Sequence, residues 1–188
     1  MTLLCGIDEA GRGPLAGPVY AAAVILGAGF KCGSLNDSKK LSAAKRSRLR
    51  LLILENALAW GEGSCSHIEI DSINILQASL LAMKRAFEQM LEKHAGKMTD
   101  NIIAIADGLF VPAVSVPCKA LVKADSQIAE VMAASILAKT ARDKYMEEMA
   151  HLYPQYGYEK HKGYPTKAHK EALLKYGPSP IQRLSFKY

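Results

Sequence analysis

The order of short apolar runs and amphipathic segments is the feature that most limits the folds open to this chain. Apolar runs at residues 3–7 and 19–26, the second bounded by Pro18 and Gly27, have the length of buried strands. Strand-like and helical segments then alternate, and the last part of the chain reads as helical. This order predicts an α/β fold, with a mixed sheet and a helical C-terminal part packed on it.

The remaining elements are expected from caps and periodicity. The first helix begins after a cap at Ser42 and ends near Asn56, with Leu49, Leu52 and Ile53 facing the core. The later helices are a long amphipathic one capped by Asp71 or Ser72, one over residues 126–152, and a last one capped by Thr166 and stopped by Gly177 and Pro178. Three further strands are expected at residues 58–67, 102–106 and 119–123.

Length and composition favour one soluble globular domain over residues 1–188. Hydrophobic residues make up 49% of the 188 and charged residues 22%. No apolar run has the length of a membrane span, and the start lacks the basic region of a signal peptide, so we expect a cytoplasmic protein with no membrane partner. The four cysteines form no C-x-x-C pair, which favours reduced, mostly buried thiols.

The distribution of charge is uneven. Residues 31–50 carry seven Lys/Arg against one Asp, and residues 151–188 carry seven against two Glu, so the rest of the chain is net acidic within a total of +6. Two basic stretches around an acidic middle favour a polyanion partner, although charge runs are also ordinary solvated faces. We expect residues 151–188 to form a basic helical extension packed on the domain.

Four acids share a placement. Asp8-Glu9, Asp107 and Asp125 each follow a strand-like run and precede a glycine, a turn or a helix, which is where open α/β sheets place their sites. Carboxylates suit Mg²⁺, and two such ions would relieve the repulsion among the acids and supply phosphodiester hydrolysis. Adjacent residues of a regular strand point to opposite faces, so Asp8 and Glu9 share a site only if the strand ends or distorts there. The alternative is that each acid is an ordinary turn or cap residue.

Five motifs along the chain resemble those of the ribonuclease HII family. They are, in order, the run from Gly6 to Val19 (GIDEAGRGPLAGPV), the run from Asp37 to Ser42 (DSKKLS), Asp107-Gly108, the run from Lys123 to Asp125 with residues 133–139 and Arg142-Asp143, and the run from Lys162 to Thr166 (KGYPT) with His169. The resemblance covers nearly the whole chain. It implies a ribonuclease H-like fold, with a five-stranded mixed sheet flanked by helices and additional C-terminal helices.

The resemblance also implies the roles of individual residues. The four metal-binding, catalytic acids would be Asp8, Glu9, Asp107 and Asp125, holding two Mg²⁺ or Mn²⁺ ions with substrate bound. Gly11, Arg12 and Gly13 would detect the ribose 2′-hydroxyl, the group that distinguishes RNA from DNA. Tyr164 would pack on the sugar next to the cut, and Lys39 and Lys40 would lie near the substrate backbone. The implied enzyme is a monomeric endonuclease that hydrolyses the RNA strand of RNA–DNA hybrids and cuts 5′ of ribonucleotides embedded in DNA, leaving 5′-phosphate and 3′-hydroxyl ends.

Some residues depart from the family pattern. Ala124 stands where a glycine is usual, which predicts a less free backbone before Asp125, and Gln182 stands where a histidine is expected. The chain also ends earlier than many relatives, at Tyr188.

Three alternative functions fit the sequence less well. Ribonuclease HIII usually has Gly-Thr-Gly in place of Gly11-Arg12-Gly13 and carries an extra N-terminal domain. A hybrid-binding module without activity has no need for uncompensated carboxylates that face phosphate. A P-loop enzyme requires the G-x-x-x-x-G-K-[ST] motif, which is missing from the sequence.

The histidines and tyrosines of the C-terminal third have ordinary structural interpretations. His161 and His169 are candidates for proton transfer, but exposed histidines beside lysines more often contact phosphate or solvent. The tyrosines at 145, 153, 156 and 158 are expected to pack the C-terminal helices against the sheet rather than to stack on bases.

Overall fold

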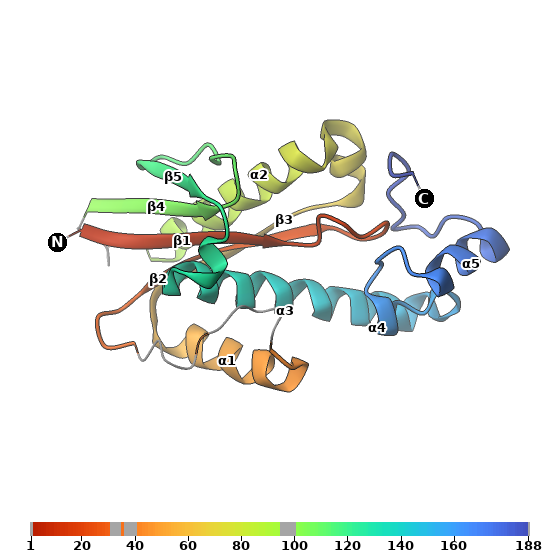
Figure 1. Ribbon diagram of the computed structural model, residues 1–188, viewed down its shortest axis with the longest axis horizontal. Coiled ribbons are helices and arrows are strands. Elements are labelled where there is room, and N and C mark those ends of the chain that lie inside the picture. The colour runs from red at the N-terminus through yellow and green to blue at the C-terminus, as the bar shows by residue number, and fades with distance from the viewer. Residues whose placement is uncertain (1, 31–34, 36–40, 95–100, 188) are drawn as a thin grey trace.

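A five-stranded mixed sheet forms the centre of the molecule in this computed structural model, which describes residues 2–30, 35, 41–94 and 101–187 (Figure 1). Its strands are β1 (Thr2–Ala10), β2 (Val19–Leu26), β3 (Ala57–Cys65), β4 (Asn101–Asp107) and β5 (Cys118–Leu121). The spatial order is β3-β2-β1-β4-β5, with antiparallel pairs β1–β2 and β2–β3 and parallel pairs β1–β4 and β4–β5. The predicted mixed sheet is therefore confirmed, and the ends of the three parallel strands meet at one edge.

Helices cover both faces of this sheet (Figure 1). They are α1 (Ala43–Asn56), α2 (His67–Lys93), α3 (Ala129–Leu152), α4 (Tyr158–His161) and α5 (Lys167–Tyr176), with 3-10 turns η3 (Ala124–Ser126) and η4 (Pro154–Tyr156). Helix α2 packs its Phe87 and Met90 against one face, where Ile7 of β1 is buried. On the other face, Ile53 of α1 and Leu137 of α3 share a core with β2. Leu52 is 38% exposed, so its expected place in the core was wrong.

The start of α2 differs from the prediction. Ser66, not Asp71 or Ser72, caps the helix, because the hydroxyl of Ser66 accepts from the amide of Glu69 while the Glu69 carboxylate accepts from the amide of Ser66. The helix is interrupted at Asn74 (φ 65°), whose side-chain oxygen accepts from the amides of Leu76 and Gln77. The helix therefore starts again at Asn74, a few residues after the predicted caps at Asp71 or Ser72.

The caps of α1 and α5 are those predicted. The hydroxyl of Ser42 accepts from the amide of Lys45, that of Thr166 accepts from the amide of His169, and Gly177 ends α5. Helix α3 begins at Ala129 rather than Ser126, because residues 124–126 form the separate turn η3.

The C-terminal elements pack beyond the ends of the strands, around the end of α3 (Figure 1). Tyr156 and Tyr158 are buried there with Met146 of α3, and Leu15 and Ala16 of the loop after β1 belong to the same core. Tyr156 and Tyr158 thus pack the C-terminal helices as predicted, but against α3 and this loop, whereas the ring of Tyr145 lies 6.2 Å from that of Tyr20 on β2. Within the described ranges, none of the helices combines the length and hydropathy required of a membrane span.

Candidate active site

Three of the four predicted acids come together at the ends of the parallel strands. Asp8 lies near the end of β1, Asp107 is the last residue of β4, and Asp125 lies in η3, just after β5. Carboxylate oxygens of the three lie within 4.8 Å of one another. Asp8 is 4% exposed and Asp125 5%. Oxygen ligands at this spacing suit a hard divalent cation.

The electrostatics of the cluster are unfavourable without a cation. Burial, reinforced by the negative charges of Glu9 and Asp107, raises the pKa of Asp8 well above its usual range. Hydrogen bonds from the Glu9 amide, 2.7 Å from Oδ1 of Asp8, and from the Ser135 side chain oppose this shift. A bound cation would stabilise the charged form that the cluster now disfavours.

Glu9 lies outside the group of three. Strand β1 stays paired with β2 through Ala10, but its pairing with β4 ends at Ile7, so on the side of β4 the strand ends just before Asp8-Glu9. Oε1 of Glu9 is 3.5 Å from Nη1 of Arg12, whereas Oε2 is buried and has no hydrogen-bond partner among the described residues. Burial raises the pKa of Glu9; Arg12 opposes this shift and Asp107 adds to it. An orphaned buried carboxylate oxygen beside the three aspartates fits a site that takes a cation.

A tight turn positions Asp125. The amide of Ala124 donates to Oδ1 of Asp107 at 2.7 Å, which ties η3 to the end of β4. Lys123 takes the left-handed conformation, with φ of 59°. Ala124 has a negative φ, which any residue with a side chain can adopt. The departure from glycine at 124 therefore puts no strain on the backbone before Asp125.

The loop over residues 11–17 lies between β1 and the C-terminal elements. Gly11 has φ of +101°, and a Cβ placed there would lie 2.1 Å from Nε of Arg142, so only glycine fits. A Cβ on Gly13 would meet Cε1 of Tyr164 at 3.7 Å. The predicted pair of recognition elements, residues 11–13 and Tyr164, is therefore brought together, and Tyr164 is 42% exposed.

Two buried arginines shape this loop, and sequence reasoning missed both. Arg142 of α3 is 1% exposed, and its guanidinium donates to the carbonyls of Ala16, Pro18 and Lys162. Arg183 is 0% exposed and also donates to carbonyls of the loop. Arg142 belongs to a pair, Arg142-Asp143, that resembles part of a family motif, but its acceptors are distant in sequence, and no local pattern marks a carbonyl-binding arginine.

The two histidines are buried, contrary to the expectation that they contact phosphate or solvent. Nε2 of His161 lies 2.9 Å from the carbonyl oxygen of Tyr156, and Nδ1 of His169 lies 3.0 Å from that of Tyr164. Their rings are stacked with centroids 4.6 Å apart. Burial lowers the pKa of each imidazole. Through Tyr164, His169 supports the turn that presents the tyrosine.

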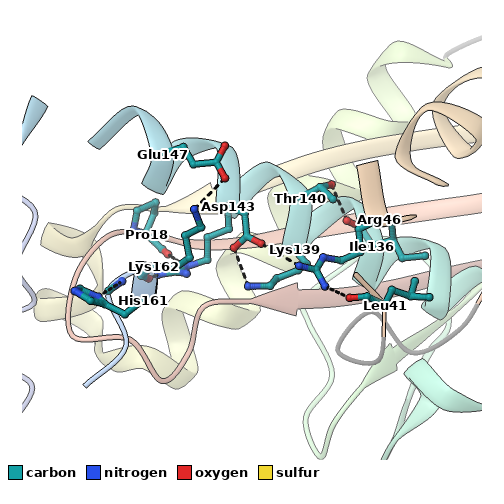
Figure 2. A network of polar contacts seen from close by, with 12 residues as sticks. Pro18, Leu41, Arg46, Ile136, Lys139, Thr140, Asp143, Glu147, His161 and Lys162 are labelled. Carbon is teal, nitrogen blue, oxygen red and sulfur yellow. Dashed lines mark hydrogen bonds and ion pairs between the residues drawn. The ribbon is translucent and has the colours of Figure 1, made fainter. Parts of the chain in front are cut away.

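The basic stretches are only partly described. Lys39 and Lys40 lie outside the described residues. In the rest, Figure 2 shows that several bases are held by acids of α3: Asp143 pairs with Lys139 (2.7 Å) and Arg46 (3.7 Å), and Glu147 pairs with Lys162 (2.9 Å). Lys45, Arg48, Lys167 and Lys170 are exposed. Lys160, Lys175 and Lys187 of the C-terminal stretch are exposed as well, and exposed bases of this kind can offer their charge to a polyanion.

Comparisons with known proteins agree with this geometry. A family model described as Ribonuclease HII matches residues 5–188. A curated ribonuclease HII from Treponema denticola is 54% identical over 193 residues, with 98% of each chain covered. Among solved structures, a ribonuclease H2 from Pyrococcus horikoshii superposes with a TM-score of 0.75 at 24% identity, covering 98% of this chain and 94% of the other. A structure described as Bst-RNase HIII in complex with Mn²⁺ gives a TM-score of 0.77 at 18% identity, covering 98% and 67%.

Proposed function

The chain belongs to the ribonuclease HII family and is therefore an endoribonuclease, and we propose that it hydrolyses the RNA strand of RNA–DNA hybrids and cuts on the 5′ side of ribonucleotides embedded in duplex DNA. The products are a 5′-phosphate and a 3′-hydroxyl. The observation that carries the proposal is the convergence of Asp8, Asp107 and Asp125 within 4.8 Å beside the loop over residues 11–17.

The four acids are proposed as the catalytic, metal-binding residues. Asp8, Asp107 and Asp125 would hold the cations, and the unpartnered oxygen of Glu9 would complete the set. Two Mg²⁺ or Mn²⁺ ions would activate the attacking water and stabilise the leaving oxygen. The chain contributes the fixed geometry: the amide of Ala124 orients Asp107, and Ser135 and the amide of Glu9 orient Asp8.

Substrate selection is proposed to rest on sugars. Gly11, Arg12 and Gly13 would contact the ribose 2′-hydroxyl, and the exposed ring of Tyr164 would pack on the next sugar. A sugar with a hydroxyl under that ring would leave the hydroxyl unpaired, so the pair favours an RNA-to-DNA junction. Only a correctly seated ribose would bring its 5′ phosphate to the cations that the acids would hold. Lys39 and Lys40 would neutralise phosphates of the backbone.

We also propose three further properties of the protein. Residues 1–188 would form one catalytic domain with residues 151–188 as its basic extension, the protein would act as a monomer, and it would act in the cytoplasm. The packing of Tyr156 and Tyr158 against the loop after β1 supports the first of these.

Cleavage of three end-labelled duplexes tests the function. They are an RNA–DNA hybrid, DNA with one embedded ribonucleotide, and plain DNA, each incubated with Mg²⁺ and with Mn²⁺. We expect cutting of the first two, with the cut mapped to the 5′ side of the ribonucleotide. Cutting of plain DNA, or cutting 3′ of the ribonucleotide, would overturn the proposal.

A further inference from the structure

Arg183 makes an unusual set of contacts. Its guanidinium donates four hydrogen bonds, all to backbone carbonyls of one loop: Nη2 to Gly11 (2.6 Å), Nη1 to Arg12 (3.0 Å) and Pro14 (2.8 Å), and Nε to Gly17 (2.8 Å). Burial, with the charge of Arg142, lowers the pKa of Arg183 to about 9, so it is charged at neutral pH. Burying a cation that has only carbonyl partners costs folding free energy. The contacts of Arg183 are therefore better explained by the shape that they give the loop than by added stability.

These contacts fix the direction of two amides. A trans peptide places its C=O and its following N–H on opposite sides, and the described peptides include no cis bond. Because the carbonyls of Gly11 and Arg12 point to Arg183, the amides of Arg12 and Gly13 point away from it. The same rule is visible at Pro14, where the next amide, of Leu15, donates to the carbonyl of Gly163 at 2.8 Å.

The two amides are available to a ligand. Arg12 and Gly13 are both exposed, and neither amide donates a hydrogen bond within the part of the chain that the structure describes. Arg183 therefore leaves two aligned donors beside Tyr164, in the segment proposed to meet the ribose.

Arg183 is itself held in place from α2. Asp71 accepts from the amides of Leu184 (2.9 Å) and Ser185 (3.0 Å) and from the hydroxyl of Ser185 (2.5 Å). The amide of Arg183 donates to the carbonyl of Leu15 at 2.8 Å. The tail is thus fixed on both sides of the guanidinium, by α2 and by the loop that it shapes.

We propose that Arg183 is a positioning residue for sugar selection, and that its guanidinium aims the amides of Arg12 and Gly13 at the 2′ substituent of the nucleotide to be cut. The inference rests on the proposed role of residues 11–13. A lysine at 183 keeps the charge but offers one point of contact in place of a planar fork. It would leave the carbonyls of Gly11 and Arg12 free to rotate, and their amides with them.

The test compares sugars at one position. Two duplexes carry, at the same site in DNA, either a ribonucleotide or its 2′-fluoro analogue, which cannot donate a hydrogen bond and accepts only weakly. We measure kcat and KM for the wild type and for Arg183→Lys, together with hybrid affinity in Ca²⁺ and the melting temperature. Arg85→Lys is the matched control. Arg85 lies on α2 and also donates to a backbone carbonyl, that of Ser64, but none of its hydrogen bonds within the described residues reaches the loop over residues 11–17.

We expect Arg183→Lys to lower kcat/KM on the ribonucleotide by about 10- to 100-fold, because one or two aligned hydrogen bonds to the 2′-hydroxyl would be lost. Cleavage of the 2′-fluoro duplex should fall much less, so the ratio of kcat/KM between the two sugars should decrease strongly. The affinity for the duplex should change less than about twofold. A purely structural role would lower both rates together with the melting temperature. Arg85→Lys should keep the wild-type ratio.

Asp71→Asn keeps the test decisive if Arg183→Lys does not fold. It weakens the hold on the tail but leaves the guanidinium, so the ratio should fall in the same direction by a smaller factor. A wild-type ratio in whichever of the two variants folds would overturn the role of Arg183. Equal cleavage of both sugars by the wild type would instead overturn the proposed role of residues 11–13.

Discussion

Oδ1 of Asp107 lies 2.7 Å from the backbone nitrogen of Ala124, so one carboxylate both faces the other acids and holds the turn that carries Asp125. Asn at position 107 keeps this acceptor but removes the charge. We expect Asp107→Asn to lower cleavage in Mg²⁺ by at least about 100-fold, because a bound cation supplies several kcal/mol of transition-state stabilisation and the variant would hold it less well. Hybrid affinity should be retained.

Melting temperatures complete this prediction. Without metal, Asp107→Asn should melt at or above the wild-type temperature, because one repulsive charge next to Asp8 is gone. Added Mn²⁺ should raise the melting temperature of the wild type more than that of the variant. Near-normal cleavage by the variant would remove Asp107 from the metal site.

Tyr164 should matter most at a single ribonucleotide. Its exposed ring lies beside Gly13, where it is proposed to pack on the sugar that follows the ribonucleotide. Tyr164→Ala should reduce cleavage at one embedded ribonucleotide by about 10-fold more than cleavage within an all-RNA strand, equivalent to roughly 1.4 kcal/mol. Tyr164→Phe, which keeps the ring, is the control. Equal losses on both substrates would make Tyr164 general packing.

Gly11 and Gly13 should respond differently to alanine. At Gly11, a methyl group meets the Arg142 side chain at 2.1 Å in a left-handed backbone, which should cost about 1–3 kcal/mol of folding free energy. At Gly13 the nearest atom is 3.7 Å away, so Gly13→Ala should fold with near-wild-type stability. Urea unfolding of both variants measures the difference; similar midpoints would argue against the described path of the loop.

Salt should reveal which lysines meet phosphate. The logarithm of the hybrid association constant should fall steeply with the logarithm of salt concentration. Replacing Lys39 and Lys40, or Lys167 and Lys170, with alanine should reduce that slope by about one for each phosphate that is no longer neutralised. Lys84→Ala on α2 is the control. A slope unchanged in both double variants would place the substrate groove elsewhere.

The stacked histidines should make the fold sensitive to acid. Burial lowers the pKa of both His161 and His169, so the folded state prefers neutral rings. Their contribution to stability is therefore fully present above the ordinary histidine pKa of about 6.5 and is lost as the pH falls from there towards the lowered values. His169→Asn keeps a donor for the Tyr164 carbonyl and cannot titrate. The difference in unfolding free energy between wild type and variant should shrink in magnitude or change sign below about pH 6.5; a pH-independent difference would contradict this prediction.

The sequence predicted what depends on local pattern. Caps at Ser42 and Thr166 and apolar runs ending at Asp107 are local signals, and the structure follows them. The start of α2 was mispredicted although its signal was present, since Ser66 and Glu69 have the spacing of a capping box. The contacts of Arg142 and Arg183 were beyond reach, because their carbonyl acceptors lie on a loop that only the folded chain brings near.

The bond between Arg183 and the carbonyl of Gly11 joins residues 172 positions apart. A ribosome makes the N-terminus first, so every acid of the site is synthesised before Arg183 exists. A nascent chain or a fragment ending at Gln182 would carry all four carboxylates but no guanidinium to fix the loop beside them. If Arg183 positions the loop as proposed, the active-site acids would be in place before sugar discrimination is acquired, because discrimination would begin only once residue 183 can reach the loop.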